Sequence, residues 1–274
     1  MTIVNRLEKH TKGVWTCDYS PESPLLASGS NDNSILLWDT KSYKVTSQLA
    51  IHDDAVYDVK FSLSGNFLAS CGKGLICIWD MKNLSKPLAT VKDQHQDFIY
   101  AVNFIENDKY VVTGFIDGYI LIVETADVTK YKKHFIPKEV NYNTIEENNL
   151  DPGNTVYHIS KFKNLKNDNE ILTSHSDGSI NTWLINAGNM ELKNKVAYFN
   201  EPVTSVNTSY DDLGMIASCK DHSAMVWRID QTDKIDYSLV GHSDIVTCAD
   251  FVSKDVVATS SYDCSLRLWK LNVY

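Results

Sequence analysis

Residues 26–39 read Leu-Ala-Ser-Gly-Ser-Asn-Asp-Asn-Ser-Ile-Leu-Leu-Trp-Asp, and similar stretches recur along the chain. This recurrence is the main sequence evidence for the fold. Good copies occupy residues 68–80, 172–183, 216–227 and 257–269, and a weaker copy occupies residues 111–123. The copies are anchored at Trp38, Trp79, Val123, Trp183, Trp227 and Trp269, at intervals of 41, 44, 60, 44 and 42 residues. Self-similarity at such a period is typical of repeat folds.

Each copy has the pattern of a small antiparallel sheet. An Asp stands six residues before the anchor at Asp32, Asp117, Asp177, Asp221 and Asp263, whereas the second copy has Lys73 there. A run of β-patterned residues lies upstream, for example over 56–61 and 246–251. Three apolar runs separated by turn residues in each unit predict strands.

The pattern resembles the WD-repeat β-propeller family. Trp-Asp closes the first two copies, a His precedes the first strand at His10, His52, His95 and His242, and Gly-His occurs at 241–242. The resemblance implies a single all-β domain over 1–274, a six-bladed propeller of four-stranded blades. The repeats run approximately over 8–49, 50–91, 92–135, 153–198, 199–239 and 240–274.

Two segments stand outside the regular repeats. The polar, acidic residues 136–152 account for the 60-residue interval and are predicted to be a loop insertion, either a tolerated one or a second partner contact. The last repeat has room for three strands only, and residues 2–7 precede His10 as an outer strand precedes His242. We expect this N-terminal strand to pair with the last blade and close the ring, the alternative being a strand from another protein.

Composition excludes several classes of function. The 274 residues carry a net charge of −9, which disfavours direct nucleic-acid binding. No apolar run is long enough for a membrane helix, and the N-terminus lacks a signal-peptide pattern. We expect a cytoplasmic protein, with the nucleus as a further location. The six cysteines form no Cys-x-x-Cys pair and fit apolar strand positions, and the histidines outside the repeat positions show no ligand spacing. No metal or cofactor is expected.

Some polar residues recur with the repeat. The resemblance implies a structural hydrogen-bond relay through His10, Ser28, Asp32 and Trp38, and again through His242, Thr259, Asp263 and Trp269. His, Asp and a hydroxyl could also form a hydrolase triad, but recurrence at repeat positions favours the structural role. No phosphate loop or nucleophile elbow occurs, so we expect no catalytic residues.

One position of the repeat favours a binding role. The residue after the first apolar residue of each inner strand is Trp15, Tyr57, Tyr100, Tyr157, Thr204 or Thr247. In the family this position lies at the mouth of the central channel, on the wider top face, and the residue before the turn Asp also faces it. Ile116 and Tyr262 would extend the apolar surface there. Tyr and Trp are enriched in interfaces, although they also suit strands.

The sequence therefore predicts a non-catalytic scaffold or adaptor, a subunit of a hetero-oligomeric complex. It would bind proteins or peptides through Trp15, Tyr57, Tyr100, Ile116, Tyr157 and Tyr262. One alternative is a reader of modified peptides that uses the aromatic residues as a cage. An enzyme with its active site in the channel is the other alternative, although no catalytic motif supports it.

Overall fold

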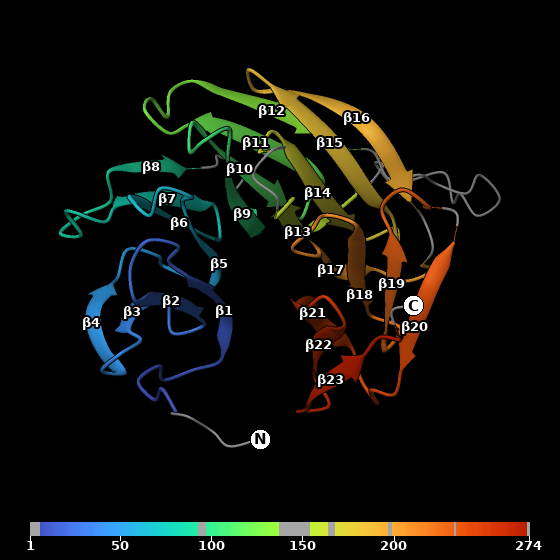
Figure 1. Ribbon diagram of the computed structural model, residues 1–274. Coiled ribbons are helices and arrows are strands. Elements are labelled where there is room, and N and C mark those ends of the chain that lie inside the picture. Colours follow the sequence, from blue (N-terminus) through green and yellow to red (C-terminus); the bar gives the residue numbers. More distant parts are fainter. Residues whose placement is uncertain are drawn as a thin grey trace, which may run out of the picture. The chain divides into compact units, whose positions relative to one another are not determined.

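The computed structural model describes residues 6–92, 97–136, 154–163, 168–196, 199–232 and 234–272. This part of the chain consists of strands joined by turns and loops, without a helix (Figure 1). The strands form six antiparallel sheets that follow one another along the chain, and we number them blades 1 to 6. The prediction of an all-β, six-bladed propeller is thereby confirmed.

Blades 1 to 3 each contain four strands. Blade 1 comprises β1 (Val14–Tyr19), β2 (Leu25–Ser30), β3 (Ile35–Asp39) and β4 (Lys44–Leu49). Blade 2 comprises β5 (Val56–Phe61), β6 (Phe67–Gly72), β7 (Leu75–Asp80) and β8 (Ala89–Lys92). Blade 3 comprises β9 (Ile99–Ile105), β10 (Tyr110–Phe115), β11 (Tyr119–Glu124) and β12 (Tyr131–Phe135).

Blades 4 and 5 are also four-stranded, and blade 6 has three strands in the described residues. Blade 4 comprises β13 (Val156–Lys161), β14 (Glu170–His175), β15 (Ile180–Asn186) and β16 (Asn189–Val196). Blade 5 comprises β17 (Val203–Thr208), β18 (Gly214–Cys219), β19 (Ser223–Arg228) and β20 (Ile235–Val240). Blade 6 comprises β21 (Val246–Ser253), β22 (Val256–Ser261) and β23 (Leu266–Lys270).

The chain forms two compact units. Unit 1 contains residues 1–115 and 121–132, and unit 2 contains residues 116–120 and 133–274. In unit 1, β1, β5 and β9 lie side by side, and in unit 2, β13, β17 and β21 do so (Figure 1). Hydrogen bonds join these inner strands within each unit: Thr16 Oγ1 donates to Asp58 at 2.8 Å, and Ala249 N donates to Ser205 Oγ at 3.0 Å.

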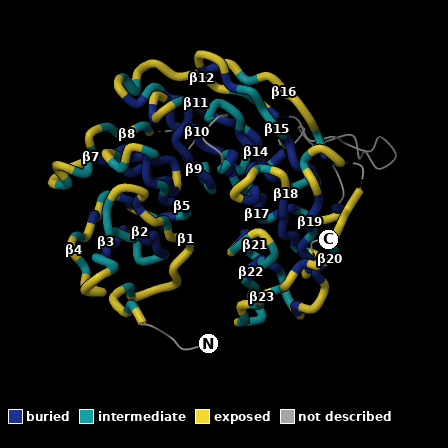
Figure 2. Tube along the Cα trace, viewed as in Figure 1, coloured by how far each residue is buried: buried dark blue, intermediate teal, exposed yellow. Residues whose placement is uncertain are grey.

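The inner and middle strands supply the cores. In unit 1, Ala27, Leu68 and Val59 are fully buried in one cluster, and in unit 2, Val206 and Trp227 are fully buried in another. Figure 2 shows the contrast with the outer strands, such as β4 and β20, which are largely exposed. Apolar residues on a strand covered on both faces favour this burial.

The Asp six residues before each anchor shapes the hairpin between the second and third strands. In five blades its Oδ1 accepts the backbone N–H two residues later, from Ser34, Tyr119, Ser179, Ser223 or Ser265. Such a side-chain bond mimics a backbone turn, which explains why Asp suits the position. Blade 2 has a hairpin one residue shorter: ten residues separate the hydroxyl and the Trp in blade 1, against nine in blade 2.

Two expectations fall largely outside the described residues. Of the predicted N-terminal strand 2–7, only Arg6 and Leu7 are described, and neither lies in a strand. Closure of the ring by residues 2–7 therefore stays a prediction. Of the predicted insertion 136–152, only the buried Ile136 is described.

Candidate functional site

Every inner strand contains a β-bulge at the same place. In all six blades the pairing with the second strand skips one residue directly after the first residue of the inner strand. The skipped residues are Trp15, Tyr57, Tyr100, Tyr157, Thr204 and Thr247, the six that the sequence pattern singled out. Because a bulge removes a residue from the ladder and redirects its side chain, these positions are suited to contacts outside the sheet.

In unit 1 the bulges bring three predicted site residues together. The ring centroids of Trp15 and Tyr57 lie 5.8 Å apart, and those of Tyr57 and Tyr100 lie 5.2 Å apart at an interplanar angle of 81°. Edge-to-face packing at these separations is favourable. The Trp15 side chain remains 48% exposed, and its indole N–H donates to Asn31 Oδ1.

A fourth ring, which sequence reasoning missed, completes this aromatic cluster. Phe98 stacks on Tyr100 at 6.3 Å and meets Tyr57 edge-on at 5.9 Å. Lys73 Nζ lies 5.5 Å from the Phe98 ring centroid, and the backbones of Lys73 and Phe98 form a β-bridge. Phe98 precedes its strand, outside the repeat position used for the prediction, so its spacing gave no signal. We call Trp15, Tyr57, Phe98 and Tyr100 the aromatic cluster.

In unit 2 the tyrosine at the bulge of blade 4 has a different neighbour. Lys220 Nζ lies 4.7 Å from the Tyr157 ring centroid and donates to the Tyr157 hydroxyl at 3.1 Å. The threonines at the other two bulges form hydrogen bonds with the blades: Thr204 bonds Ser218 of its own blade at 2.8 Å and donates to the Val246 carbonyl of blade 6, and Thr247 bonds Ser260 at 2.9 Å. These hydroxyls therefore serve hydrogen bonds within and between blades 5 and 6.

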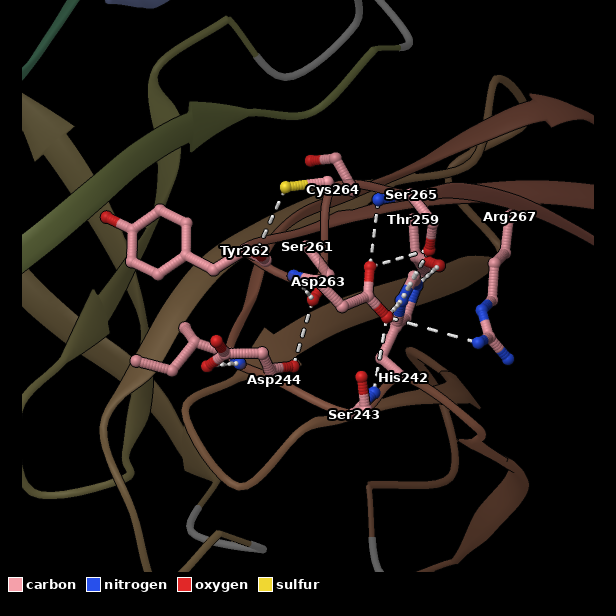
Figure 3. Close-up of polar contacts among 12 residues, drawn as sticks. His242, Ser243, Asp244, Thr259, Ser261, Tyr262, Asp263, Cys264, Ser265 and Arg267 are labelled. Atoms are coloured by element: carbon pink, nitrogen blue, oxygen red, sulfur yellow. Dashed lines mark hydrogen bonds and ion pairs between the residues drawn. The ribbon is translucent and has the colours of Figure 1, made fainter.

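The two flanking apolar residues of unit 2 differ in exposure. Tyr262 is 54% exposed, and its ring extends away from the polar network beside it (Figure 3). Ile116 is half-buried, and its carbonyl accepts a hydrogen bond from Thr155 Oγ1 at 2.6 Å. Tyr262 therefore offers the larger contact area.

The predicted relays have the expected connections. In blade 6, His242 Nδ1 lies 2.8 Å from Asp263, His242 Nε2 lies 2.7 Å from Thr259 Oγ1, and the Trp269 indole donates to the same hydroxyl at 2.8 Å (Figure 3). In blade 1 the corresponding distances are 2.9, 2.8 and 2.9 Å, through His10, Asp32, Ser28 and Trp38. A hydroxyl that donates to the imidazole can accept from the indole, so both ring systems are satisfied.

Hydrogen bonds also stabilise the charged form of the relay carboxylates. The Ser265 hydroxyl, together with His242 and two backbone N–H groups, holds the pKa of Asp263 well below its usual range. Burial would raise the pKa of Asp32, but bonds from Ser34, Thr11 and His10 outweigh it and lower that pKa as well. The side chains of His10 and His242 are only 5% and 1% exposed, so these groups lie inside the blades.

Blades 2 and 4 have modified relays. His52 Nε2 lies 2.9 Å from Ser70 Oγ, and burial lowers the pKa of His52 to about 4. In blade 4 the imidazole comes from inside the second strand: His175 Nε2 lies 2.7 Å from Thr173 Oγ1, which also accepts from the Trp183 indole. Burial lowers the pKa of His175 to about 4 too. Sequence reasoning missed this role because His175 does not precede the first strand.

The described residues offer little other chemistry. They contain no group of three or more His, Cys, Asp or Glu side chains placed to hold a metal ion. Nor does any helix there have the length and apolar character needed to span a membrane. All six cysteines are free thiols, of which Cys71, Cys77 and Cys219 are buried. Burial raises the pKa of both Cys77 and Cys219 to about 12, so neither is a thiolate near neutral pH.

Comparison with known families identifies the repeats. The model described as "WD domain, G-beta repeat" matches residues 1–39, 43–80, 85–123 and 234–270, more than half of the chain. The chain belongs to the WD40 family. The matched segments correspond to blades 1, 2, 3 and 6, and blades 4 and 5 have the same four-stranded order as blades 1 to 3.

Known WD40 relatives are distant. Apoptotic protease-activating factor 1 of Homo sapiens is 23% identical over 96% of this chain and 26% of its own length. A chromatin assembly factor 1 subunit of Mus musculus is 26% identical over 45% of this chain and 25% of its length. WD repeat domain-containing protein 83 homolog of Dictyostelium discoideum is 23% identical over 96% of both chains. The WD40 chain thus spans about a quarter of the first two relatives.

Proposed function

We propose that this WD40 chain is a non-catalytic scaffold that binds a protein partner through the aromatic cluster of unit 1. The observation that carries the proposal is the set of four contacting rings with Trp15 half exposed. Tyr157, Tyr262 and Ile116 of unit 2 would add contacts to the same partner or to another. The name of one relative, a subunit of chromatin assembly factor 1, supports a role as a subunit of a complex.

The aromatic cluster offers a partner a surface that is both rigid and apolar. Packing between the rings holds the aromatic cluster in place, so a partner loses little additional side-chain entropy on binding. Covering the exposed part of Trp15 contributes about 2 kcal/mol by area. Aromatic residues of this kind dominate measured interface energies, and propeller loops are held by a rigid scaffold.

Two alternatives have weaker support. The imidazole and carboxylate groups of the relays are buried and bonded to each other, which favours a structural role over hydrolysis. A cage for a methylated amine needs space between its rings. In the aromatic cluster the centroids of neighbouring rings lie only 5.2 to 6.3 Å apart. These contacts favour an aromatic platform, on which a partner lies, over a cage.

Affinity purification from native cells tests the proposal. Wild-type protein is compared with the Tyr57→Ala/Tyr100→Ala variant, which removes two rings of the aromatic cluster. The matched control is Tyr19→Ala/Tyr131→Ala, because these tyrosines are 57% and 58% exposed and lie outside the cluster. Circular dichroism melts verify that all three proteins are folded.

The expected result is a stoichiometric partner set with wild type and the control, and its loss with the cluster variant. Recovery of the same partners by all three proteins would contradict binding through the aromatic cluster and direct attention to unit 2 or residues 136–152.

We further propose a cytoplasmic or nuclear location, which microscopy of the fluorescently tagged chain would test.

A further inference from the structure

A charged position accompanies the bulges. Three residues before the bulge residues stand Lys12, Asp54, Asp97, Asn154, Glu201 and Asp244, in blade order. Four of the six blades thus have a carboxylate there, two in each unit. The lysine of blade 1 departs from this pattern.

The two carboxylates of unit 1 are close in sequence to the aromatic cluster: Asp54 stands three residues before Tyr57, and Asp97 directly precedes Phe98. Asp54 stands two residues before the start of β5, and its Oδ1 accepts the Ala55 N–H at 2.7 Å. Burial raises the pKa of the Tyr57 hydroxyl, and the negative charge of Asp54 raises it further. The charge on Asp54 therefore acts on the aromatic cluster itself. Neither Asp54 nor Asp97 forms an ion pair with another described residue.

The aromatic cluster already accepts a cation from its own chain. Lys73 replaces the turn Asp of blade 2, and its ammonium lies over Phe98. A cation on an aromatic ring is stabilised by the negative face of the π-system, and Trp is the best acceptor of the three aromatic types. Trp15, which is 48% exposed, has no such cation over it among the described residues.

We propose that the partner binds as a basic segment, with an arginine side chain stacked on Trp15 and Asp54 as its counter-charge. Arginine is preferred over lysine because a planar guanidinium stacks on an indole and still donates to a carboxylate. The uncompensated carboxylates and the exposed indole together supply the charge complementarity. This inference rests on the proposed function, because it specifies the partner of the same surface.

Selection from a displayed library of random twelve-residue peptides tests the inference with the full chain as bait. We expect arginine to be enriched among the peptides retained by wild-type protein. A selected peptide is then synthesised with arginine or with citrulline, which has nearly the same shape but no charge, and both dissociation constants are measured. The citrulline peptide should bind about fivefold more weakly or worse.

Variants of the protein assign the effect to its residues. Asp54→Asn should weaken the arginine peptide by a similar factor and leave the citrulline peptide unchanged. Glu22→Gln is the matched control, because Glu22 is an exposed carboxylate in the turn at the other end of β1. Trp15→Ala should abolish measurable binding of both peptides.

The outcomes separate this inference from the proposed function. Peptides that are retained without enrichment of arginine, and lost on Trp15→Ala, would overturn the basic partner and support the aromatic cluster. Retention that survives Trp15→Ala and Tyr57→Ala would overturn both. Failure to select any peptide would count against both as well.

Discussion

His52 Nε2 lies 2.9 Å from the hydroxyl oxygen of Ser70, inside blade 2. In blade 1 the equivalent imidazole also reaches Asp32, at 2.9 Å, but no described carboxylate bonds to His52. The shorter hairpin of blade 2 has Lys73 at the position where blade 1 has Asp32, so the carboxylate partner of the imidazole is missing there. His52 is therefore buried with little to stabilise its charged form.

We predict that acid destabilises the protein through His52 and His175. Each has a pKa of about 4 when folded and a usual value of 6.5, so the unfolded chain binds more protons between these values. Their contribution is complete above pH 6.5 and is lost as the pH falls towards 4. Each histidine accounts for about 2 kcal/mol between pH 7 and pH 5.

Urea titrations at a series of pH values measure this effect. His52→Gln removes one titrating group while an amide can still bond Ser70, so it should flatten the pH dependence by about half. The relay carboxylates do not confuse the result, because their lowered pKa values matter only as the pH falls below about 4. A pH dependence unchanged by His52→Gln would refute the assignment.

A second prediction concerns the hydroxyl at the centre of the blade 1 relay. Ser28→Ala leaves His10 Nε2 and the Trp38 indole N–H without their partner. Loss of two buried bonds should lower the free energy of unfolding by about 2–3 kcal/mol. Ser28→Thr is the control, since Thr259 makes the same contacts in blade 6, and it should retain most of the stability. Chemical denaturation distinguishes the two.

The degenerate repeat of blade 3 gives the opposite prediction. Thr113 stands ten residues before Val123, where the other relays have their hydroxyl, and its buried Oγ1 has no hydrogen-bond partner within the described residues. Thr113→Val removes this unsatisfied group at constant shape and should stabilise the protein by about 1 kcal/mol. The Thr173 hydroxyl bonds both His175 and Trp183, so Thr173→Val should instead destabilise the protein. Thermal melts measure both effects, and a change in melting temperature of the same sign in both variants would contradict this prediction.

Closure of the propeller yields a fourth prediction. β23 is the last strand of blade 6 in the described residues, and its Leu266 and Leu268 are 66% and 39% exposed. If residues 2–7 pair with β23, its outward amides exchange slowly with solvent, and deletion of residues 1–7 should accelerate that exchange by at least about tenfold. Equal exchange in the two proteins would show that the N-terminal segment does not cover this edge.

The repeat made much of this architecture predictable. The run 56–61 became β5 with the same bounds, and the Asp positions became turns, because both depend on local patterns that recur. The positions of Phe98 and His175 could not be predicted in this way. Phe98 precedes β9 and stacks on Tyr100 from there, outside the bulge position of the other three rings. His175 bonds Thr173 on its own strand, whereas the other relay histidines precede the first strand of their blade. The contacts of these two residues are visible only in three dimensions.

The six bulges have a consequence for how such a surface changes over time. A residue that the ladder skips contributes no register information, so replacing it leaves the pairing of the neighbouring strands intact. Trp, Tyr and Thr already occupy equivalent bulges in this one chain. If the bulge residues bind the partner as proposed, recognition and folding depend on different residues of each repeat. Substitutions at the bulges can then change the partner with little effect on stability.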